Sequence, residues 1–395
     1  MKADDRIREF VTKYSHELVL AALFALSVLI RIDLAPKTDW SGDYQYCIAP
    51  WVEEYRRLGV VQGLASSFTN YYIPYNLIFA FASLFPMDAW VIISILSCAG
   101  EYACVYYAYR ILRYLGGEDH AHRSIYAAVL LLFLPPMILN SAFWKQCDAI
   151  YSAFALMAFY YLLKDSYYRA FVFLSVAFVF KLQTILLFPV FLIAYFCGKK
   201  YSLLMWLRIP VTYLEAGLPA ILCGRPARSV YMIYFDQSSE YHYMFLNTGN
   251  LYRLFRSDYE AAGHLAVYGT VAFLALLTGY LIRHREAVNG ECLLQLAGVT
   301  GYGCFMTLPA MHERYDYLPI LLVTLYYAYY HRSKCYIPAM MILVTTVMYC
   351  QYLFGGNTLP EEAYALIALV AWFLALRDLI DGIQKREVCN VHKDQ

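Results

Sequence analysis

The stretch AWVIISILSCAGEYACVYYAYR, residues 89–110, carries only two formally charged side chains, Glu101 and Arg110. It is long enough to cross a bilayer as a helix, which takes roughly 20 predominantly apolar residues. Within lipid, only a helix or a closed barrel satisfies the hydrogen bonds of the backbone. Similar apolar runs recur from Leu18 to Leu379 without an intervening polar domain. The sequence therefore predicts an all-α integral membrane protein in the lipid bilayer.

Composition supports this class and excludes others. The 395 residues are 61% hydrophobic and 15% charged, with a mean hydropathy of +0.47. The formal net charge is +1 and the 31 Lys and Arg residues are scattered over short loops, so we expect no nucleic-acid partner. The 11 cysteines are isolated from one another, which indicates small buried side chains and not disulfides or metal ligands.

The distribution of Lys and Arg predicts the topology, because these residues concentrate in cytoplasmic loops. Placing the basic turns inside gives about twelve crossings with both termini cytoplasmic. The predicted crossings are 18–35, 89–110, 124–139, 149–163, 170–180, 184–197, 203–222, 264–282, 292–309, 318–330, 336–354 and 362–380. The domain plan is a cytoplasmic tail (1–17), one transmembrane domain (18–382) with external loops at 36–88 and 224–263, and a second cytoplasmic tail (383–395).

Two apolar segments depart from a simple crossing. Residues 73–85 are only roughly 13 residues long, so we expect them to dip into the outer leaflet without crossing. The segment 170–196 is interrupted by Lys181-Leu182-Gln183, which predicts two short helices that meet at a polar apex. In the first external loop, residues 43–58 alternate aromatic and charged side chains, as in an amphipathic helix on the membrane surface. A second surface segment is expected within 224–263.

The run Met311–Tyr317, MHERYDY, has four ionisable side chains in five positions between two apolar stretches. Such residues in a membrane chain indicate a functional site. In the predicted topology this run shares the outer face with the other unusual polar segments, which are residues 39–44, 70–75, 140–148, 181–183 and 224–259. A transporter concentrates its polar groups near the membrane midplane instead. The sequence therefore favours an active site on one side of the membrane.

The polar segments also carry a resemblance. They read SGDY at Ser41–Tyr44 with Trp51 seven residues beyond, NYxxPY at Asn70–Tyr75, WxQxDxIY at Trp144–Tyr151, FKLQ at Phe180–Gln183 and HERY at His312–Tyr315. In their order and spacing these motifs resemble the GT-C glycosyltransferases, over about Arg31 to Pro319. Within that superfamily the chain is most similar to bacterial enzymes that use polyprenyl-phosphate sugars and are related to the mannosyltransferases of GPI-anchor synthesis.

The resemblance implies a GT-C-like fold and an inverting transfer of a hexose from a polyprenyl-phosphate donor to a glycan or lipid-linked acceptor. The transfer would take place on the extracytoplasmic face, in the synthesis of the cell envelope or a glycoconjugate. The family's base is an acidic residue of the first external loop, which is best matched by Asp43, with Asp39 as the rival. One carboxylate is enough, because a sugar on phosphate needs little acid assistance to leave.

Cations fixed beside the leaving phosphate would stabilise the charge that it gains in the transition state. The candidates are Arg314, His312, Lys181 and Arg225. For the sugar and the acceptor, the candidates are Trp144, Gln146, Asp148, Gln183, Glu313, Tyr315, Asn247, Asn250 and Tyr72. Structural roles compete with these: Arg314 could pair only with Glu313 or Asp316, Lys181 could be a snorkelling lysine, and the Ser41-Gly42-Asp43 segment could cap a helix.

No metal is expected to be required, although Asp39, Asp43, Asp148 and Glu313 could together bind Mg²⁺ or Mn²⁺. Two other functions compete with the transferase. One is a polymerase or ligase acting on lipid-linked glycans, and the other is a flippase or transporter of such glycans. A transporter would line its path with ionisable residues at mid-bilayer, and only Lys181 and Glu101 lie between apolar neighbours in this way.

Overall fold

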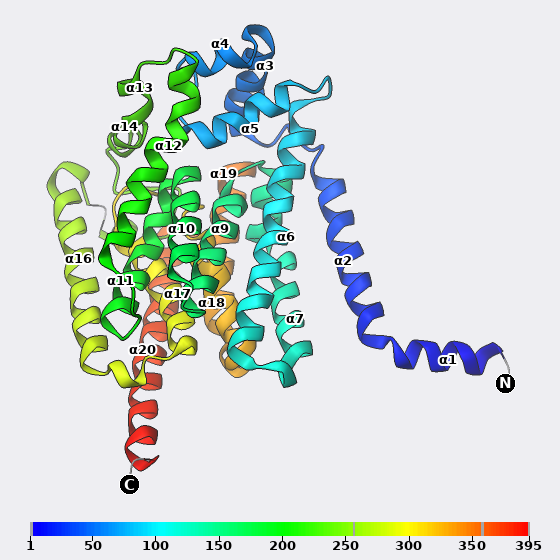
Figure 1. Ribbon diagram of the computed structural model, residues 1–395, viewed down its shortest axis with the longest axis vertical. Helices are drawn as coiled ribbons and strands as arrows, with labels where there is room; N and C mark the ends of the chain where they lie inside the picture. The colour runs from blue at the N-terminus through cyan, green and yellow to red at the C-terminus, as the bar shows by residue number, and fades with distance from the viewer. Residues whose placement is uncertain (1–2, 256, 357–358, 394–395) are drawn as a thin grey trace.

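The computed structural model describes residues 3–255, 257–356 and 359–393, and helices make up most of them (Figure 1). Within these ranges, four helices are long and apolar enough to cross a membrane, or five if one bent pair counts as a single span. The four helices are Ala89–Gly116 (α6), Tyr259–Arg283 (α16), Tyr336–Phe354 (α19) and, within α20, Glu361–Cys389. The chain is therefore all-α, with several helices of the kind that membrane proteins have.

The other predicted apolar segments also fall on helices or helical turns, although most are too short to meet the same length criterion. They are Ser15–Leu34 (α2), Ala121–Val129 (α7), Pro135–Ile138 (α8), Asp148–Leu163 (α9), Tyr167–Phe180 (α10), Phe188–Phe196 (α11), Arg208–Leu222 (α12), Gly290–Thr307 (α17) and Tyr317–Tyr330 (α18). The last helix, α20, spans Glu361–Lys393 and continues through most of the predicted C-terminal tail. The predicted N-terminal tail forms Ala3–Lys13 (α1), which buries no side chain.

Short 3₁₀ and π turns connect the helices. They are Tyr44–Ile48 (η1), Glu118–His120 (η2), Leu130–Phe133 (η3), Leu139–Phe143 (η4), Leu182–Leu187 (η5), Leu203–Leu207 (η6), Arg285–Ala287 (η7) and Arg332–Lys334 (η8).

Two breaks in the helices have causes that can be read in the sequence. Pro135 forces its predecessor Leu134 into an extended conformation, and the helical segments on either side are bent by 57°. At the second break α10 ends at Phe180, and Lys181 is extended with φ −156° and ψ 131°. The predicted interruption at Lys181 is therefore confirmed.

Short helices gather at one end of the bundle. Figure 1 shows Ala49–Leu58 (α3), Val60–Ala65 (α4), Ile73–Ser83 (α5) and Ala227–Tyr231 (α13) at the end opposite the C-terminus. The expected amphipathic segment is η1 followed by α3, which buries Val52 and Tyr55 while Glu53 is exposed. The second surface segment is α13 with Ile233–Glu240 (α14).

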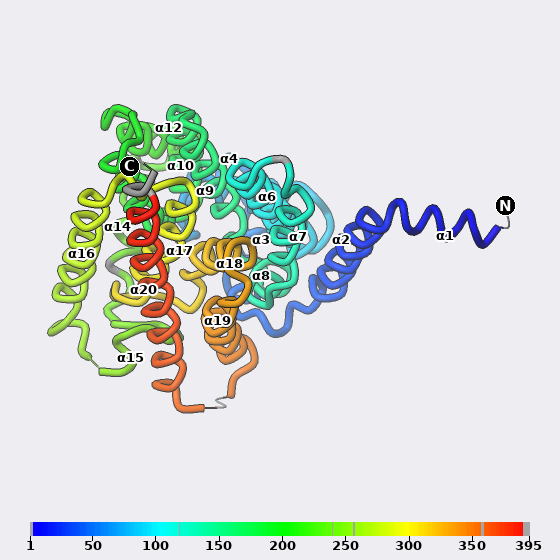
Figure 2. Tube along the Cα trace, turned by 90° about the horizontal axis from the view of Figure 1, so that it is seen from below, coloured from blue at the N-terminus to red at the C-terminus, as the bar shows by residue number. Residues whose placement is uncertain are grey.

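The interior is formed by α9, α17 and α18. Figure 2 shows α17 and α18 side by side within the bundle, with α16 towards one edge and α2 towards the other. Every residue from Cys292 to Met306 in α17 is buried. A Cβ on Gly298 would lie 2.9 Å from the backbone nitrogen of Val323, so this glycine permits the close approach of α18.

A buried ion pair joins helix α2 to the bundle. Arg31 forms a buried ion pair with Glu101 of α6 and also donates through Nη2 to the carbonyl of Leu132, at 3.0 Å. That carbonyl lies at the Pro135 break, where the helix cannot use it. The pair therefore joins α2, α6 and the broken helix.

One small parallel sheet lies beside the polar end. Phe245–Leu246 (β1) pairs with Met311–His312 (β2), and the short helix Tyr252–Phe255 (α15) follows β1. Ala310, just before β2, has φ 56°, a left-handed conformation that few non-glycine residues adopt. This turn and the pairing hold the MHERYDY run in place.

Candidate functional site

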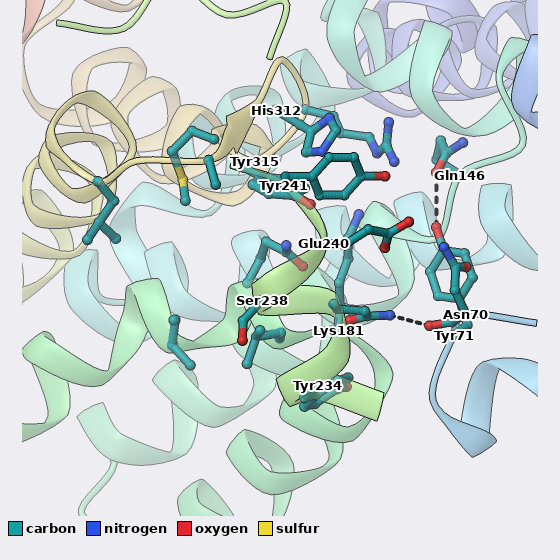
Figure 3. A pocket seen from close by; sticks show the side chains of 18 of the residues that line it. Asn70, Tyr71, Gln146, Lys181, Tyr234, Ser238, Glu240, Tyr241, His312 and Tyr315 are labelled. Atoms are coloured by element: carbon teal, nitrogen blue, oxygen red, sulfur yellow. Dashed lines mark hydrogen bonds between the residues drawn. The ribbon is translucent and has the colours of Figure 1, made fainter. Parts of the chain in front are cut away.

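A cavity of about 410 Å³ lies where the polar segments meet (Figure 3). Each of the six predicted outer segments contributes at least one residue to its lining. Examples are Asp43, Asn70, Gln146, Lys181, Gln237 and His312. The volume is in the range of small-molecule sites. The structure therefore brings together segments that are distant in the sequence.

Asp43 lies at the wall of the cavity and is held by three hydrogen-bond donors. Trp144 Nε1 and Gln146 Nε2 both donate to its Oδ2, at 3.0 and 2.8 Å, and the Tyr352 hydroxyl donates to Oδ1 at 2.7 Å. The side chain is 24% exposed, so an incoming hydroxyl group can still reach it. The carboxylate is thus fixed in orientation and open to the cavity.

Within the Ser41-Gly42-Asp43 segment, Ser41 and not Asp43 caps the turn that follows. Asp43 makes no cap hydrogen bond to the turn that follows it. Ser41 takes that part instead, since its Oγ accepts from the backbone N–H of Tyr44 at 3.2 Å and donates to the carbonyl of Trp144 at 3.2 Å. The Asp43 side chain therefore takes no part in capping and lines the cavity.

Arg314 lies between the carboxylate of Asp43 and the buried carboxyl group of Glu313. Its Nη1 lies 3.1 Å from Glu313 Oε1 and 3.6 Å from Asp43 Oδ2, and its guanidinium lies 5.2 Å from the centre of the Trp144 ring. Burial raises the pKa of Glu313 to about 7. Arg314 therefore lines the cavity while it also makes the ion pair that the structural alternative predicted.

Two further cationic candidates lie on the cavity wall. Lys181 Nζ pairs with Asp148 Oδ1 at 2.5 Å, and both side chains are buried. Burial, with the charges of Arg314 and Lys181, lowers the pKa of His312 to about 3. His312 is therefore neutral near pH 7 and could offer a phosphate only a neutral N–H donor.

Several predicted ligand residues support the wall from behind. Trp144, Asp148 and Glu313 are fully or almost fully buried and do not line the cavity. Asp148 also accepts from Asn140 Nδ2 at 3.0 Å. Behind Glu313, the Thr345 hydroxyl donates to Asp316, whose pKa is raised to about 8 by burial. These side chains position the wall and do not reach the cavity.

Three other predicted site residues do not line the cavity. Asp39 is exposed and not part of the lining. Arg225 is buried, where its guanidinium donates to Ser229. Tyr72 is buried, with its ring stacked on Tyr213 at 4.1 Å.

The two predicted asparagines also have other positions. Asn250 is buried in the loop, where its side chain accepts from the N–H of Tyr252 and donates to the carbonyl of Met244. Asn247 is exposed with φ 50°, directly after β1. By contrast Gln146, Gln183 and Tyr315 do line the cavity.

The remaining lining is largely apolar. It includes Ile48, Trp51, Ile185, Leu186, Val267 and Leu308. Ile185 on η5 and Val267 on α16 are each 38% exposed. The cavity therefore joins a charged end to an apolar side.

Sequence reasoning missed Tyr352 as a site residue, and it also missed Glu240 and Tyr241. Tyr352 comes from α19, a long apolar helix in which no local pattern marks one tyrosine among the 40 of the chain. Glu240 is the last residue of α14 and Tyr241 is the residue after it. Figure 3 shows both beside Lys181 and His312. Nothing in the long loop distinguishes them from its other polar residues.

Within residues 3–255, 257–356 and 359–393, no group of three or more His, Cys, Asp and Glu side chains is arranged to hold a metal ion. The carboxylates named as an alternative metal site are engaged or apart: Asp148 pairs with Lys181, Glu313 with Arg314, and Asp39 lies elsewhere. These residues do not fit a shared divalent site in the arrangement described.

Comparison with protein-family models and with curated proteins finds no match to this sequence. The GT-C resemblance therefore depends on the motifs quoted above and on what their residues do in the structure.

Proposed function

We propose that the chain is an inverting glycosyltransferase that moves a hexose from a polyprenyl-phosphate donor to a glycan or lipid-linked acceptor. In this proposal Asp43 is the base, the fold is GT-C-like with about twelve crossings, and the cavity opens on the extracytoplasmic face. The observation that carries the proposal is one cavity with an oriented carboxylate, two cations and an apolar side.

The carboxylate suits removal of a proton from an attacking hydroxyl. Asp43 is held through both oxygens, which limits its motion, and it remains partly exposed. In an inverting transfer the acceptor oxygen attacks the anomeric carbon as its proton passes to this carboxylate, and the bond to the donor phosphate breaks. Positioning of a base in this way contributes about 10²–10⁴-fold to rate.

The cations suit the leaving phosphate. Arg314 and Lys181 both line the cavity, and the planar fork of an arginine matches phosphate oxygens. Each is already paired with a buried carboxylate, so the cations are held in place before a ligand arrives. Fixed charges of this kind act on developing charge without reorganisation.

The apolar side suits the lipid part of the donor. Ile185 and Val267 line the cavity and are themselves partly exposed. A chain that enters here would keep its isoprenoid units among apolar side chains while its phosphate reached Lys181. Burial of apolar surface of this type contributes about 25 cal/mol per Å².

The transporter reading has less support. Its two candidate path residues, Glu101 and Lys181, are both engaged in buried ion pairs, with Arg31 and Asp148. Such pairs are fixed partners of the fold, whereas a path would need these groups to exchange partners with a moving substrate.

Asp43→Asn tests the proposal, with Asp39→Asn as its matched control. An asparagine at position 43 can place its oxygen towards Trp144 and Gln146 and its amide towards Tyr352, whose hydroxyl can accept. The fold should therefore survive, while transfer of radiolabelled hexose from a synthetic polyprenyl-phosphate hexose to membrane acceptors falls about 10²–10⁴-fold.

Asp39→Asn should leave the rate unchanged, because Asp39 is exposed and away from the cavity. Retention of more than roughly a tenth of the rate by a folded Asp43→Asn chain would exclude Asp43 as the base. Loss of transfer in Asp39→Asn alone would restore the rival assignment.

A further inference from the structure

One lysine next to the site combines full burial with a left-handed backbone. Lys145 has an exposed fraction of 0% and a φ of 63°. Its Nζ donates to the carbonyl of Phe143 at 2.6 Å, and the rings of Tyr44 and Phe143 lie 5.8 Å away. Within residues 3–255, 257–356 and 359–393, no carboxylate forms an ion pair with it.

Both features are unfavourable in isolation. A left-handed conformation costs roughly 1–2 kcal/mol for a residue other than glycine. A buried ammonium without a counter-ion also loses its hydration, and burial lowers the pKa of Lys145 to about 8. Unfavourable geometry of this kind persists where the surrounding structure enforces it, and it clusters at functional sites.

The consequence of the left-handed turn is visible in the two neighbours of Lys145. Trp144 and Gln146 donate to the same oxygen, Asp43 Oδ2. In a continuing helix these two side chains would point about 200° apart around the axis, at 3.6 residues per turn. The reversal at Lys145 removes that divergence and brings both donors onto one carboxylate.

Side chains also hold the carbonyls of this turn. Phe143 O accepts from Lys145 Nζ, Trp144 O accepts from Ser41 Oγ at 3.2 Å, and Lys145 O accepts weakly from the Tyr75 hydroxyl at 3.5 Å. Ser41 precedes Asp43 by two residues, so its hydrogen bond to Trp144 joins the turn around Lys145 to the segment that carries Asp43. The ammonium of Lys145 is one of three fixing points.

We infer that Lys145 is a positioning residue, whose left-handed backbone and buried ammonium hold Trp144 and Gln146 on Asp43. The consequence for catalysis rests on the proposed function, whereas the consequence for the geometry around Asp43 does not. A second left-handed non-glycine residue, Ala310, lies just before β2 and lines the cavity.

The test separates the backbone from the ammonium with three variants, Lys145→Ala, Lys145→Gly and Lys145→Met. All three lack the ammonium, but only glycine adopts φ 63° without strain. The first readout is ¹⁹F NMR of the full chain labelled with 5-fluorotryptophan, in which the Trp144 signal among the six tryptophans is assigned by Trp144→Phe. The second is transfer from synthetic polyprenyl-phosphate hexose.

In Lys145→Ala and Lys145→Met we expect the Trp144 resonance to shift or broaden while the other five stay in place. Transfer should fall about 10-fold to 100-fold with little change in KM, because the base and not the donor site is displaced. Lys145→Gly should recover part of both, at several times the rate of Lys145→Ala.

The control is Asp165, which has φ 56° in the turn between α9 and α10. Asp165→Ala should leave the Trp144 resonance unchanged, and a shift equal to that of Lys145→Ala would overturn the inference. An unchanged resonance in all folded Lys145 variants would overturn it as well. No recovery in Lys145→Gly would overturn the role of the left-handed backbone, and full recovery would overturn the role of the ammonium. If the unsubstituted chain transfers no sugar, the proposed function fails, and the resonances alone still decide the role of Lys145.

Discussion

Arg314 either serves a ligand or only neutralises Glu313, and a pair of substitutions can separate these roles. Arg314→Met keeps the bulk of the side chain against Trp144 but removes the charge. It leaves Glu313, which is 1% exposed, without its partner at 3.1 Å. Breaking a buried pair in this way costs about 3–5 kcal/mol of stability.

The loss should depend on pH in a defined direction. Burial raises the pKa of Glu313 from 4.5 to about 7, and the charge of Arg314 holds it below a higher value. A carboxyl group with a raised pKa binds more protons in the folded state, so its contribution to stability falls as pH rises through that window. Without Arg314 the pKa rises further and the fall continues above pH 7. Melting temperatures of the variant and the unsubstituted chain in nanodiscs should therefore diverge above about pH 7.

The double variant Glu313→Gln with Arg314→Met removes the orphaned charge. It should recover most of the lost stability and remove the part of the pH dependence that Glu313 contributes, because replacing both partners of a buried pair is often close to neutral. Transfer should stay about 10²–10³-fold below that of the unsubstituted chain, since one of the two cations proposed to face the leaving phosphate is lost. If transfer returned together with stability, Arg314 would be a partner of Glu313 and nothing more.

Three other expectations concern single features of the structure. Ala310→Gly should raise the melting temperature, because glycine removes the left-handed strain at φ 56° and gains roughly 1 kcal/mol; an unchanged or lower value would show that the turn is not strained. Tyr352→Phe should lower transfer about tenfold at nearly constant stability, since Asp43 loses one donor; a full rate would mean that the hydroxyl does not orient the base. Arg31→Met should lower the free energy of unfolding by about 3–5 kcal/mol, and the double variant with Glu101→Gln should lower it much less. Equal losses in the single and the double variant would mean that the cost does not come from leaving Glu101 unpaired.

The helices could be placed from the sequence because apolar runs and their interruptions are local signals. The break at Lys181 follows from three polar side chains inside an apolar run, and the structure has it at the same residue. The bend at Pro135 was not predicted, although Pro135 and Pro136 carry its cause. A proline pair near the end of a run resembles an ordinary helix terminus when only one sequence is read.

The arrangement around Asp43 could be predicted only in part. The polar segments that form the cavity were identified, since each stands out against its apolar neighbours. The contacts within it were not, because Trp144 and Gln146 are predicted only as sugar ligands, whereas in the structure both donate to the carboxylate of Asp43. Tyr352 reaches Asp43 from a helix 309 positions later, and no local spacing encodes such a contact.

The MHERYDY run shows how four ionisable side chains are accommodated in five positions. The run begins as the strand β2 and turns at residues 313–316. His312 and Arg314 line the cavity, whereas Glu313 and Asp316 are buried and do not line it. The pKa of His312 is lowered and those of Glu313 and Asp316 are raised, so burial reduces the charge of three of the four groups near pH 7. Arg314 is then the one member of the run that keeps its full charge at the cavity, which is why its substitution is the sharpest test of a phosphate site.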